Sequence, residues 1–261
     1  MLAIQQVIDT IIAAIPGGRK QETVDTVKTG DPAQPVKGIV TTFLATQEVV
    51  ERTIALGANL IVTHEPTFYN HLDEVDWLAG DATYVAKRRL IDEHGIVIWR
   101  FHDYWHTHEP DGILTGVLKQ LGWEGHGVAG KPYLEIPPVT LAELATLLRD
   151  KLGVAAIKAV GDPGLLCRRV GLMVGAGGGR WQIQYLREAQ LDVLVCGEIH
   201  KWETSEYVRD ALCQGQRVAL LIVGHVPSEE PGMAYLVDWL RPRFPGIPIT
   251  HVPAGSPFRY L

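Results

Sequence analysis

The stretch that decides the fold is residues 59–66, Asn59-Leu60-Ile61-Val62-Thr63-His64-Glu65-Pro66. Residues 60–62 form a short apolar run, which is typical of a strand buried in the centre of a parallel sheet. Pro66 cannot donate a ladder hydrogen bond, so the strand should end before it. In open α/β sheets, ligands bind at the carboxyl ends of the strands. We therefore expect His64 and Glu65, which lie at such an end, to take part in function.

The composition is that of an ordinary globular protein. With 261 residues, 46% of them hydrophobic, the chain can form one large domain or two tightly joined halves. A formal net charge of -6 argues against a broad basic surface, so nucleic acid is not an expected partner. The sequence contains no apolar run near the ~20 residues of a membrane-spanning helix, and its start lacks a basic leader. We expect a cytoplasmic protein without a membrane partner.

Two similar series of elements indicate an internal duplication. Each series is a strand, a helix and a second strand, followed later by a third strand, an order that favours right-handed parallel crossovers. The first strands of the two series are offset by 134 residues and the second strands by 133. The first series lies at 36–42, 46–56, 59–66 and 96–99, and the second at 170–174, 180–189, 192–198 and 218–223.

This pattern predicts an α/β fold of two related lobes with mixed, mostly parallel sheets flanked by helices. We place the first lobe at residues 1–125 and the second at 126–261. The last strand region, 218–261, could instead pack back onto the first lobe. The connecting stretch carries a clear helix from Leu141, capped by Thr140, which makes it a natural boundary.

Histidines and carboxylates gather after the predicted strands. A lone histidine at a strand end is usually only hydrogen-bonded, but several clusters at one sheet rim favour metal binding. Mixed imidazole and carboxylate ligands suit zinc, iron, manganese or nickel better than calcium or magnesium. Two such cations ~3.5–4 Å apart would activate a water molecule and hold a substrate oxygen. The four clusters are His64 with Glu65, His102 and Asp103 with His106 and His108, Glu198 with His200, and His225 with Glu229.

A glycine-rich segment, 175–179, follows one predicted strand and precedes a helix. Its backbone amides could bind a phosphate at the start of that helix. The spacing matches neither the dinucleotide-binding fingerprint nor the P-loop. A tight structural turn is therefore an equally good interpretation.

At these residues the chain resembles the Nif-three-like family, whose members are also called type 2 GTP cyclohydrolase I homologues. Residues 63–66 resemble the family's Thr-His-His-Pro motif, residues 102–106 its His-x-x-x-Asp segment, and residues 224–229 its Gly-His-x-x-Ser-Glu motif. The resemblance covers nearly the whole chain. It implies two related α/β lobes, a dinuclear metal centre in the cleft between them, and a ring-shaped homohexamer.

The resemblance also implies which residues hold the metals and what they do. The cofactors would be two divalent ions per chain, of zinc, iron, manganese or nickel. His102 or Asp103 would carry a proton or orient a ligand. The implied ligands are His64 and His225 on one ion, Glu65 and His106 on the other, and Glu229 as the bridge.

Two positions depart from the family pattern. Glu65 stands where the family has a histidine, and His106 stands where it has an aspartate. We interpret this as a reciprocal exchange, because one imidazole and one carboxylate remain if both positions face the same ion. The segment after His106 is one residue longer than in the family, so Asp103 is the alternative ligand.

Three functions compete on this reading. The first is a metal-dependent hydrolase that adds water to a purine nucleotide and opens its imidazole ring. The second is a non-catalytic metal-binding regulatory, carrier or protein-interaction protein. The third is a metal phosphoesterase or amidohydrolase, which would use the same ligands on another small molecule. The fold alone does not distinguish these three functions.

Overall fold

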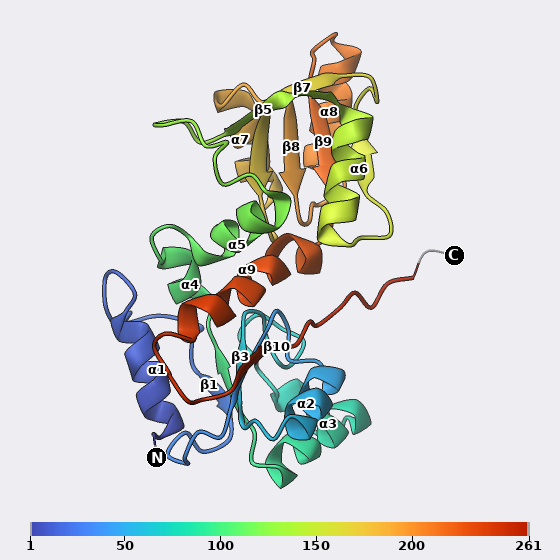
Figure 1. Cartoon of the computed structure of the whole chain (residues 1–261). Helices are drawn as coiled ribbons and strands as arrows, with labels where there is room; N and C mark the ends of the chain where they lie inside the picture. The colour runs from blue at the N-terminus through green and yellow to red at the C-terminus, as the bar shows by residue number, and fades with distance from the viewer. Residues whose placement is uncertain (1, 260–261) are drawn as a thin grey trace. The chain divides into compact units, whose positions relative to one another are not determined.

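The computed structural model describes residues 2–259 and shows a mixed α/β protein with two sheets of five strands each, flanked by helices (Figure 1). This confirms the fold class expected from the sequence. The chain divides into two compact units, Met1–Gly116 with Gly232–Gly255, and Val117–Pro231 with Ser256–Leu261. Within the described residues, no helix is long and apolar enough to cross a lipid bilayer.

The first unit is built from ten elements: α1 (Ile4–Ala13), β1 (Val27–Thr29), β2 (Ile39–Thr42), α2 (Gln47–Ala55), β3 (Leu60–Thr63), the short 3-10 helix η1 (Asp76–Leu78), α3 (Ala82–Glu93), β4 (Val97–Arg100), α4 (Asp103–Thr107) and β10 (Ile249–His251). The strand order is β1-β4-β3-β2-β10, with β1 antiparallel to β4 and the other neighbours parallel. Every residue of β2, β3 and β4 is buried, which explains why these strands occur as apolar runs.

The register of the three central strands brings their carboxyl ends level. Thr63 of β3 is opposite Thr42 of β2 on one side and Arg100 of β4 on the other. The residues that follow β3 and β4 therefore leave the sheet at the same edge. This is the edge at which the sequence predicts His64 and the histidines after residue 100.

The second unit is built from eight elements: β5 (Leu134–Thr140), α6 (Leu141–Leu152), β6 (Lys158–Val160), β7 (Leu166–Met173), α7 (Gly179–Glu188), β8 (Val193–Cys196), α8 (Thr204–Cys213) and β9 (Ala219–Ile222). The order is β5-β7-β8-β9-β6, in which β7, β8 and β9 are parallel and the two edge strands antiparallel. Alternate residues of β8 enter two cores, Val193 with Leu144 of α6, and Leu194 with Leu186 of α7. Two further helices, α5 (Gly112–Leu121) and α9 (His225–Leu240), contain residues of both units.

The two sheets repeat one topology, which confirms the internal duplication. In each unit a helix precedes an antiparallel edge strand, and three parallel strands joined by helices follow. The partial order β1-β4-β3-β2 corresponds strand for strand to β6-β9-β8-β7. The fifth strand breaks the equivalence, because β10 is parallel to β2 whereas β5 is antiparallel to β7.

Candidate metal centre

His64 is completely buried directly after β3. Its backbone N–H donates to the carbonyl oxygens of Thr42 and Phe43, at 3.2 and 3.1 Å, which continues the pairing of β2 and β3. The imidazole Nδ1 lies 3.3 Å from the carbonyl oxygen of Phe101. A carbonyl oxygen only accepts hydrogen bonds, so Nδ1 carries the proton and Nε2 presents the lone pair.

His102 and His106 lie one helical turn apart at α4, a short helix that Asp25 holds in place. The backbone N–H groups of His102, Asp103 and Tyr104 donate to the Asp25 carboxylate at 2.8, 3.1 and 2.8 Å. Burial raises the pKa of Asp25, although these three hydrogen bonds act in the opposite direction. The Asp25 carboxylate accepts hydrogen bonds from the backbone N–H groups at the start of α4, which have no partner within the helix. It therefore fixes the backbone positions from which the His102 and His106 side chains extend.

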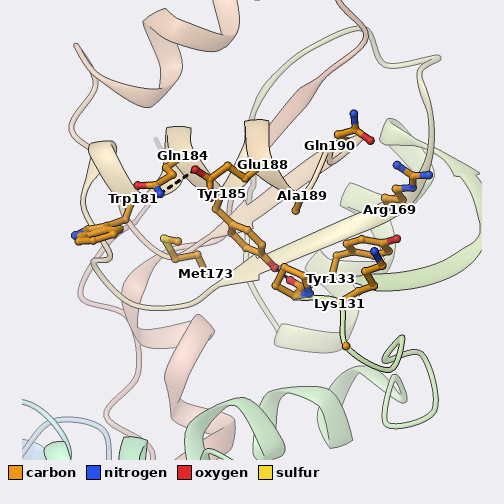
Figure 2. A pocket seen from close by; sticks show the side chains of 12 residues that line it. Lys131, Tyr133, Arg169, Met173, Trp181, Gln184, Tyr185, Glu188, Ala189 and Gln190 are labelled. Atoms are coloured by element: carbon orange, nitrogen blue, oxygen red, sulfur yellow. Dashed lines mark hydrogen bonds between the residues drawn. The ribbon is translucent and has the colours of Figure 1, made fainter.

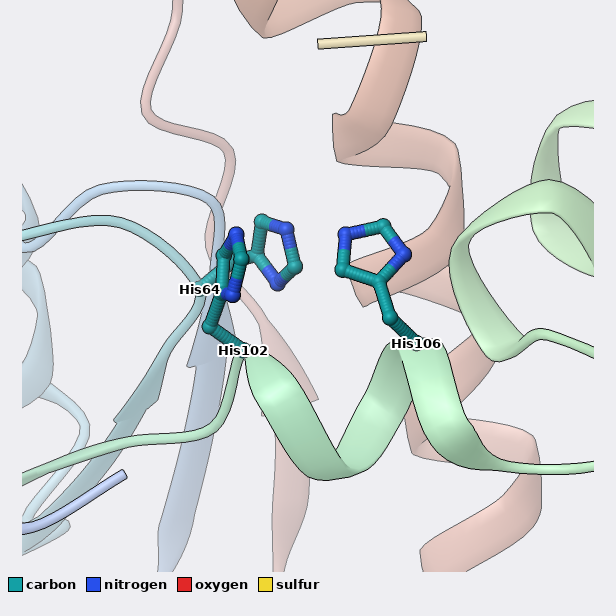
Figure 3. Close-up of side chains that lie close together, drawn as sticks. All are labelled: His64, His102 and His106. Atoms are coloured by element: carbon teal, nitrogen blue, oxygen red, sulfur yellow. The ribbon is translucent and has the colours of Figure 1, made fainter. Parts of the chain in front are cut away.

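The three imidazoles form one cluster (Figure 3). Ring centroids are 4.6 Å apart for His64 and His102, 5.0 Å for His64 and His106, and 4.9 Å for His102 and His106. One ligand nitrogen from each ring lies within 4.8 Å of the other two. This separation and donor set fit a divalent transition metal ion.

A hydrogen bond from Nδ1 orients the other two rings of this histidine cluster as well. His102 Nδ1 lies 2.9 Å from Asp103 Oδ1, and His106 Nδ1 lies 2.9 Å from Asp111 Oδ2. Carboxylate or carbonyl partners behind imidazole ligands are the usual second layer of a metal site, because they fix tautomer and direction. Burial, followed by the nearby His64, lowers the pKa of His102 to about 4, so this ring is neutral near pH 7.

Glu65 and Arg100 complete the polar edge of the first unit. The completely buried Arg100 donates from Nε to the His64 carbonyl at 3.1 Å and from Nη1 to the His71 carbonyl. Its Nη2 lies 3.5 Å from Glu65 Oε2, while Glu65 Oε1 lies 3.8 Å from His102 Nε2. The Glu65 carboxylate thus lies between a buried guanidinium and the histidine cluster, with a ligand oxygen within 4.8 Å of a His64 nitrogen.

Asp103, the alternative ligand, has a different environment. One carboxylate oxygen holds His102, and the other accepts from the Thr23 hydroxyl at 2.8 Å and the Val24 N–H at 3.2 Å. Burial alone would raise the pKa of Asp103, but these hydrogen bonds lower it to about 2. The ligand nitrogen of His106 lies within 4.8 Å of those of His64 and His102.

The loop of residues 66–80, which follows β3 in the chain, is held in place by buried charged side chains. Lys87 Nζ donates to the Thr67 carbonyl at 2.8 Å and lies 5.6 Å from the centre of the Phe68 ring. Lys28 Nζ lies 3.4 Å from Asp73 Oδ2, with both side chains nearly inaccessible to solvent. Burial lowers the pKa of Lys87 to about 8, although Asp73 opposes the shift.

The buried Lys87 predicts a rise in stability at alkaline pH. Its pKa is about 8 in the folded chain but ~10.4 when unfolded, so between these values the unfolded chain binds more protons and stability increases with pH. From pH 7 to pH 10 the wild type should gain on the order of 2 kcal/mol of unfolding free energy relative to Lys87→Met. Urea unfolding of both proteins at several pH values in this range measures the difference in unfolding free energy. Lys158→Met, at an exposed lysine, should differ from the wild type by the same unfolding free energy at every pH in this range. A constant difference for Lys87→Met as well would contradict the prediction.

In the second unit, His225 begins α9 and meets two carboxylates. Its Nε2 lies 3.1 Å from Glu229 Oε2, one helical turn later, and its Nδ1 lies 3.5 Å from Glu198 Oε1. Glu229 is buried and Glu198 is exposed. Gly175 packs against this pair, because a Cβ there would come within 2.2 Å of Glu229 Oε1. Its N–H donates to the Ser228 hydroxyl at 3.0 Å, which gives the glycine-rich turn a packing role.

Sequence reasoning found the histidines but missed two of the residues that support them. Asp25 lies in a polar segment with no pattern of its own, and its contact with His102 spans 77 residues. Arg100 could have been noticed, because a charged residue at the end of the apolar strand β4 needs buried partners.

Comparisons with known proteins agree with this fold. Residues 3–254 match the family model described as Duf34/NIF3 (NGG1p interacting factor 3). A Streptomyces coelicolor protein named GTP cyclohydrolase 1 type 2 homolog is 27% identical over 228 residues, 79% of this chain and 76% of the relative. A Clostridium perfringens protein of the same name is 22% identical over 252 residues, 89% of each chain.

Two solved structures show the same fold over the whole chain. The Staphylococcus aureus protein SA1388 has a TM-score of 0.79 at 18% identity, covering 100% of this chain and 99% of that one. A Bacillus cereus protein described as related to NIF3 has a TM-score of 0.78 at 14% identity, with the same coverage.

Proposed function

The chain belongs to the Duf34/NIF3 family, and we propose that it is a metal-dependent hydrolase of a small molecule. The observation that carries the proposal is the histidine cluster of the first unit, in which three imidazole nitrogens lie within 4.8 Å of one another. Each ring is oriented through Nδ1 by an oxygen acceptor. Oriented imidazoles such as those of His64 and His106 are the usual ligands of a catalytic divalent cation, and a third imidazole held beside them can carry a proton.

The proposal uses two divalent cations per chain. His64, Glu65 and His106 are the metal ligands of the first unit, and His225 and Glu229 are those of the second. A bound cation would supply a Lewis acid and lower the pKa of water, which is the chemistry that hydrolysis near neutral pH needs. The donor types suit zinc, iron, manganese or nickel.

His102 and Asp103 would move and hold a proton beside these ligands. His102 is neutral at pH 7, and its Nδ1–H donates to Asp103 Oδ1, so Nε2 is the atom that can accept a proton. Asp103 would then stabilise the charged ring. The proposed substrate is a purine nucleotide, in keeping with the names of the relatives. A cytoplasmic location and a homohexamer complete the proposal.

A non-catalytic metal-binding regulatory or carrier protein is the second candidate. The family description as an interacting factor favours it. The two functions differ in their response to metal removal. A hydrolase should hold its cations and lose turnover of a nucleotide panel when a chelator is added, whereas a carrier should pass its metal to an apo acceptor without turnover.

Metal content is the first test. Protein purified without chelator should contain about two divalent ions per chain by mass spectrometry, in line with a two-metal hydrolytic site. His64→Ala and Glu229→Ala should each lower that content. His94→Ala, at an exposed histidine outside the cluster, is the matched control and should leave it unchanged. Absence of metal after reconstitution would overturn the proposed hydrolase.

A further inference from the structure

A second candidate site lies wholly within the second unit. A cavity of about 570 Å³ is lined by α7, β7 and the loop of residues 130–133 (Figure 2). It shares no residue with the His225 and Glu229 donor pair. Its volume is in the range of small-molecule sites, and it mixes aromatic rings with charged groups.

The floor of this cavity is the ring of Tyr185, which lies against β7 because Gly171 has no side chain. A Cβ at Gly171 would come within 2.9 Å of the Tyr185 ring. Alternate strand residues share a face, so Arg169 and Met173 flank this ring on the same side of β7. The Tyr185 hydroxyl donates to the carbonyl of Pro132, which connects the floor to the loop.

The two ends of the cavity differ in chemistry. Trp181 and Met173 lie at one end, and Lys131, Tyr133 and Arg169 lie at the other (Figure 2). The Trp181 indole is 61% exposed in the first turn of α7, and the Arg180 guanidinium lies 6.0 Å from its ring centre. An aromatic face at this position can stack on a planar ring.

The opposite end carries two cationic side chains, Lys131 and Arg169, that form no ion pair among the described residues, although Glu135 is the register partner of Arg169 on the neighbouring strand. The Arg169 guanidinium lies 5.7 Å from the centre of the Tyr133 ring. The lining carboxylate, Glu188, already accepts from Gln184 at 3.0 Å and lies 4.0 Å from the Arg187 guanidinium. The Lys131 and Arg169 side chains therefore favour binding of an anion at this end of the cavity.

We propose that this cavity binds a small molecule with a planar aromatic ring and an anionic group, the ring against Trp181 and Met173 and the anion at Lys131 and Arg169. Arginine recognises phosphate and carboxylate by the same paired donors, so both anions fit. None of the proposed metal ligands lines the cavity, and the assignment does not depend on the hydrolase proposal.

Calorimetric titration of the whole chain with four probes tests it. AMP and naphthoate carry a ring and an anion, adenosine lacks the anion, and inorganic phosphate lacks the ring. Saturable binding of AMP, naphthoate or both supports the proposal when Arg169→Ala weakens it. That condition is needed because AMP also belongs to the substrate class proposed for the metal site. Adenosine and phosphate should bind at least about ten-fold more weakly. Equal affinity for either of them, or no saturable binding of AMP and naphthoate, would overturn it.

Matched variants locate the binding. Arg169→Ala and Trp181→Ala should each weaken binding by about ten-fold or more, and Arg169→Lys should retain part of it. Arg209→Ala is the control, at an exposed arginine of α8 that pairs with Glu206 at 3.0 Å and lies outside the cavity lining. Trp202→Ala, at an indole outside the lining, controls for the loss of an exposed aromatic ring. If AMP binds undiminished to Arg169→Ala with an unchanged melting temperature, it binds elsewhere and the assignment is wrong.

Discussion

The Glu65→His variant should lose about one of its two proposed cations, and adding His106→Asp should restore it. Glu65 lies 3.5 Å from Arg100 Nη2 and 3.8 Å from His102 Nε2. Histidine at this position removes the carboxylate that offsets the buried guanidinium and leaves the cations without one anionic ligand. Metal per chain, measured by mass spectrometry after equal reconstitution, is the readout.

The double variant tests the exchange more directly than the single variant, because positions 65 and 106 together again supply one imidazole and one carboxylate. One neighbour needs a control. Asp111 now accepts from His106 Nδ1 at 2.9 Å, and in the double variant it would face another carboxylate. The comparison should therefore be repeated with Asp111→Asn, which removes that repulsion. Failure to recover metal in both backgrounds would mean that the two departures from the family pattern do not compensate each other.

The sequence predicts the buried framework because that framework depends on local pattern. The apolar runs at β2, β3 and β4 are continuous since both faces of the sheet are covered, and Thr46 caps α2 as its position suggests, accepting from the Val49 N–H at 3.2 Å. The short edge strands β1, β6 and β10 have three residues each and carry no such signal. Their pairing is decided by the strands beside them.

Helix α9 shows where local rules mislead. Two prolines, at positions 227 and 231, argue against a helix that begins at His225. Pro227 falls in the first turn, where the missing N–H costs nothing, and the helix continues past Pro231. His225 and Glu229 are thereby one turn apart on a helix, a relation that the sequence motif contains but does not reveal.

Long-range contacts account for the rest of what the sequence does not predict. The three histidines are predicted to share one sheet edge, because parallel strands end there. The orientation of the three imidazoles depends on Asp25, Asp111 and the Phe101 carbonyl, and no local sequence pattern indicates these residues as their partners. The cavity beside Tyr185 likewise needs Gly171 and the loop of residues 130–133 to meet in space.

Replacement of Arg100 by methionine should cost about 3–5 kcal/mol of unfolding free energy, the usual loss when one partner of a buried ion pair is removed. Methionine replaces the aliphatic part of the arginine side chain but not its guanidinium, so the loss comes from the polar groups left behind and from the space that the guanidinium vacates. The polar groups are the carbonyls of His64 and His71, and the Glu65 carboxylate.

Urea unfolding of Arg100→Met beside Arg88→Met measures this cost. Arg88 pairs with Asp92 at 2.9 Å on the exposed side of α3, and such surface pairs contribute ~0–1 kcal/mol. Lysine at position 100 should recover only part of the loss, because an ammonium lacks the planar fork that reaches two carbonyls and a carboxylate together. If Arg100→Met unfolds at the same urea concentration as Arg88→Met, the guanidinium does not hold the loop after β3, and the position of Glu65 beside the histidine cluster must be maintained by other contacts.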